Sequence, residues 1–376
     1  MCWVPIDGKS HGRLRVAFTK RELPSEFALS GHSADNRILA TALEVRQHDP
    51  DTPLVFISKD INLRIRAAAL GLEVQEYDVE RTDISELYTG IFNLQVSGDV
   101  LSTLFSEGEA PMPNGSNGEI PYSPNAFAVV TDEAGQGSAL ARLRSDKETM
   151  TLLKGKGPMV WGIRPRNKEQ RFALELLLDD SIRLVTLVGR AGTGKTLLAL
   201  AAGLQKVAED QAYQRMLVSR PVFPLGKDIG FLPGDVEDKL RPWMQPVHDN
   251  LELLLGLSAS DKKKGRSTTE IFDMDLVHIE PLTYIRGRSI PNQFILVDEA
   301  QNLTPHEVKT IITRVGEDTK IVLTGDPYQI DNPYVDSTNN GLVHVVNRFR
   351  DEEIAGHVVL AKGERSDLAE RAANLL

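Results

Sequence analysis

The sequence predicts an α/β protein with a mostly parallel sheet in its C-terminal part. From residue 161 onward, short apolar runs alternate with segments of helical periodicity. This alternation is typical of parallel strands covered by helices on both faces. One apolar run, residues 184–188, leads into the segment GRAGTGKT (residues 189–196), and a helix-forming run follows at 197–202. Strand, glycine loop and helix in this order indicate a phosphate-binding domain.

The segment 189–196 fills every position of the G-x-x-x-x-G-K-[ST] pattern. Glycines let the main chain approach a polyphosphate, and the N–H groups at the start of the helix face it. We expect Lys195 to reach the β- and γ-phosphates of ATP and the Thr196 hydroxyl to hold Mg²⁺. The full set of expected nucleotide contacts in this loop is Gly189, Arg190, Ala191, Gly192, Thr193, Gly194, Lys195 and Thr196.

Two further predicted strands end in polar groups. Residues 294–297 run into Asp298 and Glu299, and residues 321–324 run into a turn that ends at Gln329. Because ligands of parallel sheets lie beyond the carboxyl ends of the strands, these groups are expected beside the glycine loop. We expect Asp298 to hold Mg²⁺ through water, Glu299 to polarise the attacking water and Gln329 to sense the γ-phosphate.

Two candidates have alternative interpretations. The amide of Gln170 is suited to paired hydrogen bonds with adenine, but a glutamine near a helix start is also ordinary. Arg365 is either a solvated surface residue or an arginine finger on the γ-phosphate, supplied within the chain or across a subunit boundary.

Several runs along the C-terminal part resemble the PhoH family of ATPases. These are SRPV (219–222), ILVDEAQNLTPHEVKTIITRVG (295–316), LTGDPYQID (323–331) and AKGERSDLAE (361–370). The family is similar to the motor cores of superfamily 1 helicases, so the resemblance implies one RecA-like P-loop NTPase domain over 161–376. It also implies ATP hydrolysis, a homo-hexameric ring and single-stranded or structured RNA as the track. By the same likeness Gln170 becomes an adenine reader and Arg365 a finger that acts in trans.

Composition restricts the class of protein. The chain has 376 residues, of which 41% are hydrophobic, with one cysteine and a net charge of −10. A single cysteine excludes an internal disulfide and a cysteine-clustered metal site, and fits a reducing cytoplasm. No apolar run approaches the roughly 20 residues of a membrane span, and we expect no membrane partner. The acidic balance argues against nucleic-acid binding over the whole surface but leaves room for a local basic channel.

The texture of the sequence divides it into three parts. Residues 1–95 alternate strand-like and helix-like signals and are expected to form an α/β domain, with a helix at 36–45 and a strand at 54–58. Residues 96–160 are rich in Gly, Pro, Ser and Asn, and we expect a linker with a small β element at 125–130 and 138–142. Residues 161–376 are expected to form the ATPase domain.

Three arginines are the candidate RNA contacts: Arg220, Arg286 and Arg288. Single strands are commonly held by basic groups along the backbone together with aromatic platforms. Phe223 and Tyr284 are candidate platforms, whereas the basic residues at 262–266 lie in a Gly/Ser-rich stretch typical of a solvated loop.

Asp35 and Asp60 stand at a helix start and a strand end. They are either Mg²⁺ or Mn²⁺ ligands or simply a helix-capping and a turn-forming residue, and from the residues alone the structural interpretation is favoured. ADNRILATAL (34–43) and VFISKDINLRIRAAALGL (55–72) resemble the later half of a PIN ribonuclease domain, a known fusion partner of PhoH. The resemblance implies a partial PIN-like domain over residues 1–95, in which the two aspartates match the third and fourth of four acidic residues. The first two are not found, so we expect a poor nuclease: a fragment, a late start or a remnant.

The favoured function is therefore an ATP-driven RNA helicase or remodelling motor with an incomplete ribonuclease module. One alternative is a nucleotide-controlled assembly switch without unwinding, and another is a PIN ribonuclease regulated by ATP. A small-molecule kinase is a fourth class, against which the helicase-like runs argue. Stimulation of ATP turnover by single-stranded RNA, and unwinding of a duplex, separate the motor from the nucleotide-controlled switch.

Overall fold

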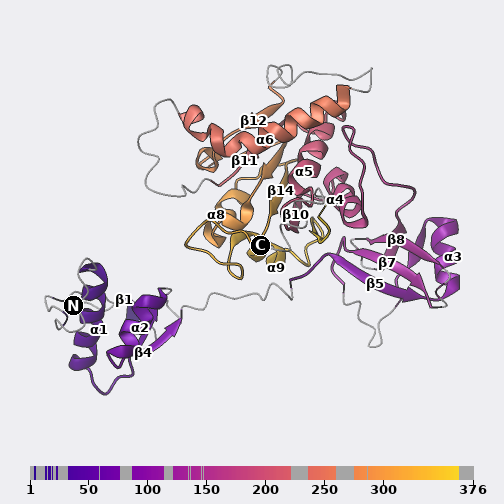
Figure 1. Ribbon diagram of the computed structural model, residues 1–376. Helices are drawn as coiled ribbons and strands as arrows, with labels where there is room; N and C mark the ends of the chain where they lie inside the picture. The colour runs from indigo at the N-terminus through magenta and orange to yellow at the C-terminus, as the bar shows by residue number, and fades with distance from the viewer. Residues whose placement is uncertain are drawn as a thin grey trace. The chain divides into compact units, whose positions relative to one another are not determined.

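The computed structural model describes residues 33–58, 60–76, 87–113, 122–133, 137–144, 148–221, 236–259, 275–285 and 287–363, with 4–5, 13–14, 16–17, 19, 23, 135 and 146. The chain divides into two compact units, Met1–Glu80 and Arg81–Leu376. Figure 1 shows the helices and strands of both units and labels many of them. None of the helices in these ranges is long and apolar enough to cross a membrane.

The first unit is a small α/β assembly. Two helices and a pair of parallel strands enclose its core, and a short antiparallel pair precedes them. Leu39, Phe56 and Leu63 are among the buried residues of this core. The elements are β1 (Val4–Pro5), β2 (Arg13–Leu14), α1 (Ser33–His48), β3 (Val55–Ser58), α2 (Ile61–Ala69) and β4 (Glu73–Glu76). The helix and strand predicted at 36–45 and 54–58 are confirmed.

The second unit begins with a five-stranded mixed sheet in the order β5-β7-β8-β9-β6. Its elements are β5 (Ile91–Val96), α3 (Gly98–Glu107), β6 (Glu109–Pro111), β7 (Phe127–Asp132), β8 (Ser138–Leu143) and β9 (Thr149–Leu152). The predicted β element is the β7–β8 antiparallel hairpin. The structure differs from the predicted linker over 96–160, because buried residues such as Val130 and Met150 give this region its own core. It also differs from the predicted boundary at 95, since β5 pairs with β7 in this sheet.

The larger part of the second unit is a six-stranded, wholly parallel sheet in the order β12-β11-β13-β14-β10-β15. Its strands are β10 (Leu184–Gly189), β11 (Arg215–Ser219), β12 (Val277–Ile279), β13 (Gln293–Val297), β14 (Lys320–Gly325) and β15 (Ala355–Leu360). This arrangement confirms the predicted fold class.

Helices cover both faces of this sheet. They are α4 (Lys168–Leu178), α5 (Lys195–Leu204), α6 (Val236–Ala259), α8 (Pro305–Ile312) and α9 (Gly341–Arg348). A π-helical segment at Gln205–Glu209 follows α5, and short 3-10 helices lie at Leu282–Ile285 and Ala300–Asn302. Successive strand residues point to opposite faces. Val185 and Leu187 accordingly pack with α4, α5 and α6, whereas Leu184 and Val188 pack with α8 and α9.

The five-stranded sheet is joined to the parallel sheet along β15. The Val359 N–H donates to the Thr89 carbonyl at 2.9 Å. Gly90 has φ 75°, and a Cβ at this position would lie 1.8 Å from the His357 carbonyl oxygen, so only glycine fits. Phe127 stacks on Phe172 of α4 with ring centroids 4.4 Å apart. These contacts make the small sheet a fixed part of the second unit.

Candidate nucleotide-binding and hydrolysis site

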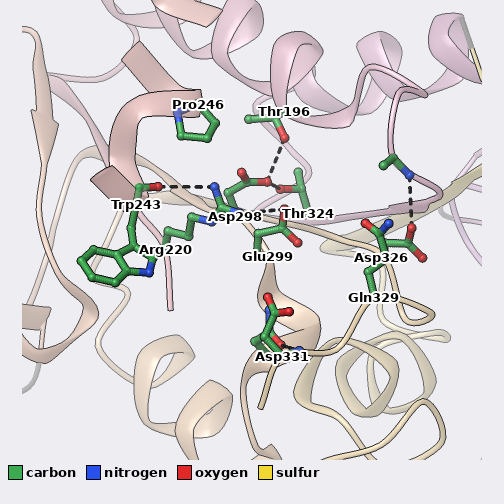
Figure 2. A network of polar contacts seen from close by, with 12 residues as sticks. Thr196, Arg220, Trp243, Pro246, Asp298, Glu299, Thr324, Asp326, Gln329 and Asp331 are labelled. Atoms are coloured by element: carbon green, nitrogen blue, oxygen red, sulfur yellow. Dashed lines mark hydrogen bonds and ion pairs between the residues drawn. The ribbon is translucent and has the colours of Figure 1, made fainter. Parts of the chain in front are cut away.

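The carboxyl ends of three neighbouring strands form the candidate site. β14 lies between β10 and β13 with parallel pairing on both sides. The glycine loop follows β10, Asp298 and Glu299 follow β13, and the turn to Gln329 follows β14. The prediction that these groups gather at one edge of the sheet is confirmed, and Figure 2 shows them together.

The glycine loop has the backbone that its sequence requires. Gly192 and Gly194 have φ values of 82° and 90°, a region that other L-residues rarely adopt. The side chain of Thr193 is fully buried, and its hydroxyl donates to the Arg190 carbonyl at 2.9 Å. The loop is thus preformed, and α5 begins directly after it at Lys195. A helix start of this kind is a site for phosphate.

Lys195 is folded into its own loop. Its Nζ donates to the carbonyls of Gly189 at 2.5 Å and Arg190 at 3.1 Å, and the residue is buried. These two carbonyls hold the ammonium group over the centre of the loop. A phosphate oxygen is a stronger, charged acceptor for the same group.

Gln170 lies against the glycine loop, as a purine-reading role requires, but its amide already has two partners. Nε2 donates to the Thr193 carbonyl at 3.1 Å, and Oε1 accepts from the Arg166 N–H at 2.9 Å. A Cβ on Gly194 would lie 3.2 Å from Nε2, which shows how closely the amide packs on the loop. Gln170 therefore supports the loop, and each end of its amide retains capacity for one further hydrogen bond. Adenine reading stays a prediction.

Asp298 is held between two hydroxyl groups. Its Oδ1 accepts from Thr196 Oγ1 at 2.8 Å and from Thr324 Oγ1 at 2.5 Å, and its side chain is buried. Thr196 and Asp298 supply the hard oxygen ligands that Mg²⁺ prefers, and Mg²⁺ usually takes only one or two carboxylates beside substrate phosphates. The pair fits that ion. Within the described ranges there is no group of three or more His, Cys, Asp or Glu residues that would form an all-protein metal cage.

Glu299 occupies an unusual backbone position. Its φ and ψ are 55° and 37°, in the left-handed region, and it precedes the short 3-10 turn Ala300–Asn302. Such a conformation costs on the order of 1–3 kcal/mol and persists where the surroundings fix it. Both carboxylate oxygens have donors: Arg220 Nη2 lies 3.1 Å from Oε1, and Gln301 Nε2 lies 2.6 Å from Oε2.

Gln301, which the sequence did not single out as a functional residue, connects the three strand ends. It is fully buried. Besides Glu299, its Nε2 donates to the Gln329 carbonyl at 2.8 Å, and its Oε1 accepts from the Asp326 N–H at 3.1 Å. Asp326 in turn accepts from the Ala191 N–H of the glycine loop at 3.1 Å. Thr324, Asp326 and Gln301 thus form the frame that Asp298 and Glu299 depend on.

Gln329 is placed at the same edge by this frame through its backbone, and its side chain is exposed. An exposed amide on a fixed backbone suits a residue that contacts a bound nucleotide. The role of Gln329 as a sensor of the γ-phosphate stays a prediction.

The other predicted contacts are distributed differently. Arg220 joins the site through Glu299. Arg288 forms an exposed ion pair with Glu280, with Nη1 and Oε2 3.1 Å apart. Arg286, Arg365, Phe223 and residues 262–266 lie outside the described residues, as does the side chain of Tyr284.

The two candidate carboxylates of the first unit have local partners. Asp60 caps α2, because its Oδ1 accepts from the N–H groups of Asn62 at 2.8 Å and Leu63 at 3.1 Å. Asp35 lies in the first turn of α1, and its Oδ2 is 3.8 Å from Arg66 Nη1. Both contacts agree with the structural interpretation of these residues.

Comparison with known proteins gives two family matches. Residues 162–375 match the PhoH-like protein family, and residues 6–78 match a PIN domain family. The second match covers the range in which the sequence resembles the later half of a PIN domain.

Relatives are similar over nearly the whole chain. Protein PhoH2 of Bacillus subtilis (strain 168) is 47% identical over 382 residues, covering 99% of this chain and 84% of the relative. Protein PhoH2 of Mycolicibacterium smegmatis is 36% identical over 377 residues, covering 99% and 81%. Among solved structures, the Pif1 helicase from Candida albicans aligns with a TM-score of 0.30 and 17% identity, over 56% of this chain and 43% of that one.

Proposed function

Since this chain belongs to the PhoH-like protein family, we propose that it is an ATP-hydrolysing motor that remodels or unwinds RNA, working as a homo-hexameric ring. The observation that carries the hydrolytic part is the Thr196–Asp298 contact of 2.8 Å, with Glu299 as the next residue in the chain. It brings the expected metal ligands and the expected water-activating carboxylate to the mouth of a preformed phosphate loop.

Each group has a defined task in this proposal. Lys195 leaves the loop carbonyls for the β- and γ-phosphates, and the loop N–H groups bind the remaining phosphate oxygens. Thr196 and Asp298 would hold Mg²⁺, which would supply positive charge beside the phosphates. Glu299 orients a water molecule; the water oxygen bonds to the γ-phosphorus as the bond to the ADP oxygen breaks. The proton of that water passes to Glu299 and then to the released phosphate.

The RNA and assembly parts of the proposal rest on family likeness together with the arginines. Arg220 and Arg288 are basic groups among the described residues, and Arg286 lies two residues before Arg288 in the sequence. Arg365 is proposed as a finger that reaches the γ-phosphate of a neighbouring subunit. The sequence contains a single cysteine, which supports the reducing cytoplasm as the proposed location of the protein.

The test is ATP turnover by the full chain with and without Mg²⁺ and single-stranded oligouridylate, followed by unwinding of a duplex with a single-stranded tail. We expect Mg²⁺-dependent turnover that RNA increases, and strand separation that needs ATP. Turnover without RNA stimulation or unwinding would instead support the nucleotide-controlled switch. Absence of turnover would contradict the hydrolytic assignment itself.

For the first unit we propose a PIN-type fold with little or no nuclease activity. The match to a PIN domain supports the fold. The capping role of Asp60 and the ion pair of Asp35 account for both carboxylates without a metal. The alternative is that this unit is a ribonuclease whose activity is regulated by ATP. Cleavage of single-stranded RNA in the presence of Mn²⁺ or Mg²⁺ would support that alternative.

A further inference from the structure

Each oxygen of the Glu299 carboxylate accepts a hydrogen bond from one protein group. Arg220 and Gln301 each donate to one of its oxygens, at 3.1 and 2.6 Å. A carboxylate that polarises a water molecule must offer that water an oxygen in the direction of the γ-phosphate. Figure 2 shows Arg220 between Trp243 and Glu299, where its guanidinium occupies one side of Oε1 and neutralises part of the charge of the carboxylate.

The two donors differ in how easily they can leave. Gln301 is fully buried and is tied to Gln329 and Asp326 as well as to Glu299. The side chain of Arg220 is 21% exposed and that of Glu299 is 30% exposed. Gln301 is therefore a fixed support, and Arg220 is the movable partner.

Arg220 is also placed to meet a second ligand. It is the residue directly after β11, and its Nη1 donates to the Trp243 carbonyl on α6 at 3.4 Å. Nη1 of the guanidinium thus makes a long hydrogen bond to a neutral carbonyl, while Nη2 pairs with Glu299. A guanidinium binds phosphate with two parallel hydrogen bonds, which this arrangement does not give it. A partly exposed ion pair contributes little free energy, so a phosphate can displace it.

We propose that Arg220 restrains Glu299 when no nucleic acid is bound, and that a phosphate of single-stranded RNA takes over Arg220 and frees Glu299 to orient the attacking water. Arg220 is then a positioning residue that couples RNA binding to ATP hydrolysis. The coupling rests on the function proposed above for the RNA part, whereas the restraint on Glu299 does not need RNA at all.

The first test measures turnover without RNA. In Arg220→Gln the restraint is lost, and we expect the basal kcat to rise about two- to fivefold, which corresponds to the free energy of a partly exposed ion pair. Stimulation by oligouridylate should fall toward onefold. An unchanged or lower basal kcat overturns the proposal. The matched control is Arg183→Gln, which removes an arginine paired with Asp318 at 3.0 Å. Arg183 lies just before β10, at the amino ends of the strands, whereas the candidate site lies at their carboxyl ends. The basal kcat of this control should equal that of the unaltered chain.

The second test needs no turnover, so it stands if Arg220→Gln folds poorly. If Glu299 and RNA compete for Arg220, each must weaken the other by the same factor. Glu299→Gln should therefore bind labelled oligouridylate about two- to fivefold more tightly in the absence of nucleotide. Equal affinity overturns the proposal. If the unaltered chain binds no RNA, the proposed RNA track fails, and the basal kcat of Arg220→Gln still decides whether the restraint exists.

A double-mutant cycle separates this effect from general electrostatics. Removing a negative charge strengthens RNA binding at a distance whatever Arg220 does. In the Arg220→Gln background, the gain from Glu299→Gln should disappear if it acts through Arg220. A gain of the same size in both backgrounds means that the two residues act independently, and contradicts the proposal.

Discussion

The hydroxyl of Thr324 on β14 lies 2.5 Å from Oδ1 of Asp298, the same oxygen that accepts from Thr196. Thr324, on the neighbouring strand, therefore helps to orient the carboxylate that also accepts a hydrogen bond from Thr196 at the end of the phosphate loop. Groups that orient a metal ligand typically change affinity or activity about 10- to 100-fold when they are removed.

Thr324→Val keeps the shape of the side chain and removes this hydrogen bond. We expect the Mg²⁺ concentration for half-maximal ATP turnover to rise about tenfold or more, with the nucleotide-free fold retained. A magnesium titration of ATPase activity measures the effect. Thr310→Val is the matched control, because the Thr310 hydroxyl donates within α8 to the His306 carbonyl; it should leave the titration unchanged. Equal titrations for both variants would show that Thr324 has no part in metal binding.

Lys195→Ala removes the ammonium group that the loop carbonyls hold in place. We expect triphosphate affinity and turnover to fall, with kcat/KM lower by about 100-fold or more, the scale for loss of one preorganised donor to a developing charge. Binding of a fluorescent ATP analogue and steady-state turnover measure the two effects. Turnover at the original rate would refute the assignment of the phosphate loop.

Arg365→Ala should leave nucleotide binding largely intact and slow hydrolysis by about 1,000-fold or more, the range for loss of an arginine finger. A finger supplied in trans makes a further prediction. Subunits with Arg365→Ala keep Glu299, and subunits with Glu299→Gln keep the finger, so mixing the two inactive variants should restore part of the turnover. Turnover that stays at the level of the separate variants, in rings shown to exchange subunits, contradicts a trans-acting Arg365.

His357 gives the stability of the second unit a defined acid sensitivity. Burial lowers the pKa of His357 to about 4 from an ordinary value of 6.5. Between these values the unfolded chain binds the proton and the folded chain does not, so the free energy of unfolding falls as pH falls from about 6.5 to 4. The loss is about 2 to 3 kcal/mol at pH 4.5. His357→Asn should reduce the difference between urea midpoints at pH 7 and pH 4.5, and an undiminished difference would assign the acid sensitivity to other groups.

Substitutions of Asp60 distinguish a helix-capping role from a role in nuclease catalysis. Asparagine caps helices as well as aspartate, whereas alanine costs about 1 kcal/mol. We expect Asp60→Asn to leave the first unit as stable as before, Asp60→Ala to destabilise it, and neither to change RNA cleavage, which should be negligible throughout. Detection of metal-dependent cleavage that Asp60→Asn abolishes would overturn the expectation of a poor nuclease.

The parallel sheet and its strand ends were predictable because buried parallel strands appear as continuous apolar runs, and because the glycine loop fixes one of them. The sequence pattern does not indicate a functional role for Gln301 or Thr324. Their roles arise only where β13, β14 and the glycine loop meet, and Thr324 looks like one polar residue in an apolar strand. The sequence does not predict the full sheet at 91–152, because its strands are short and its Gly- and Pro-rich segment, residues 112–118, is typical of a linker.

The contact between Gly90 and His357 has a consequence for assembly. β15 is the last strand of the parallel sheet, and an uncovered last strand invites further strands to add to it. Residues 88–90 and the Asn125 amide, which donates to the carbonyls of Glu353 and Ala355, occupy that border. Addition of a further strand at β15 is thereby blocked, so contacts between subunits in the proposed ring cannot be made by pairing a strand of one copy with β15 of the next.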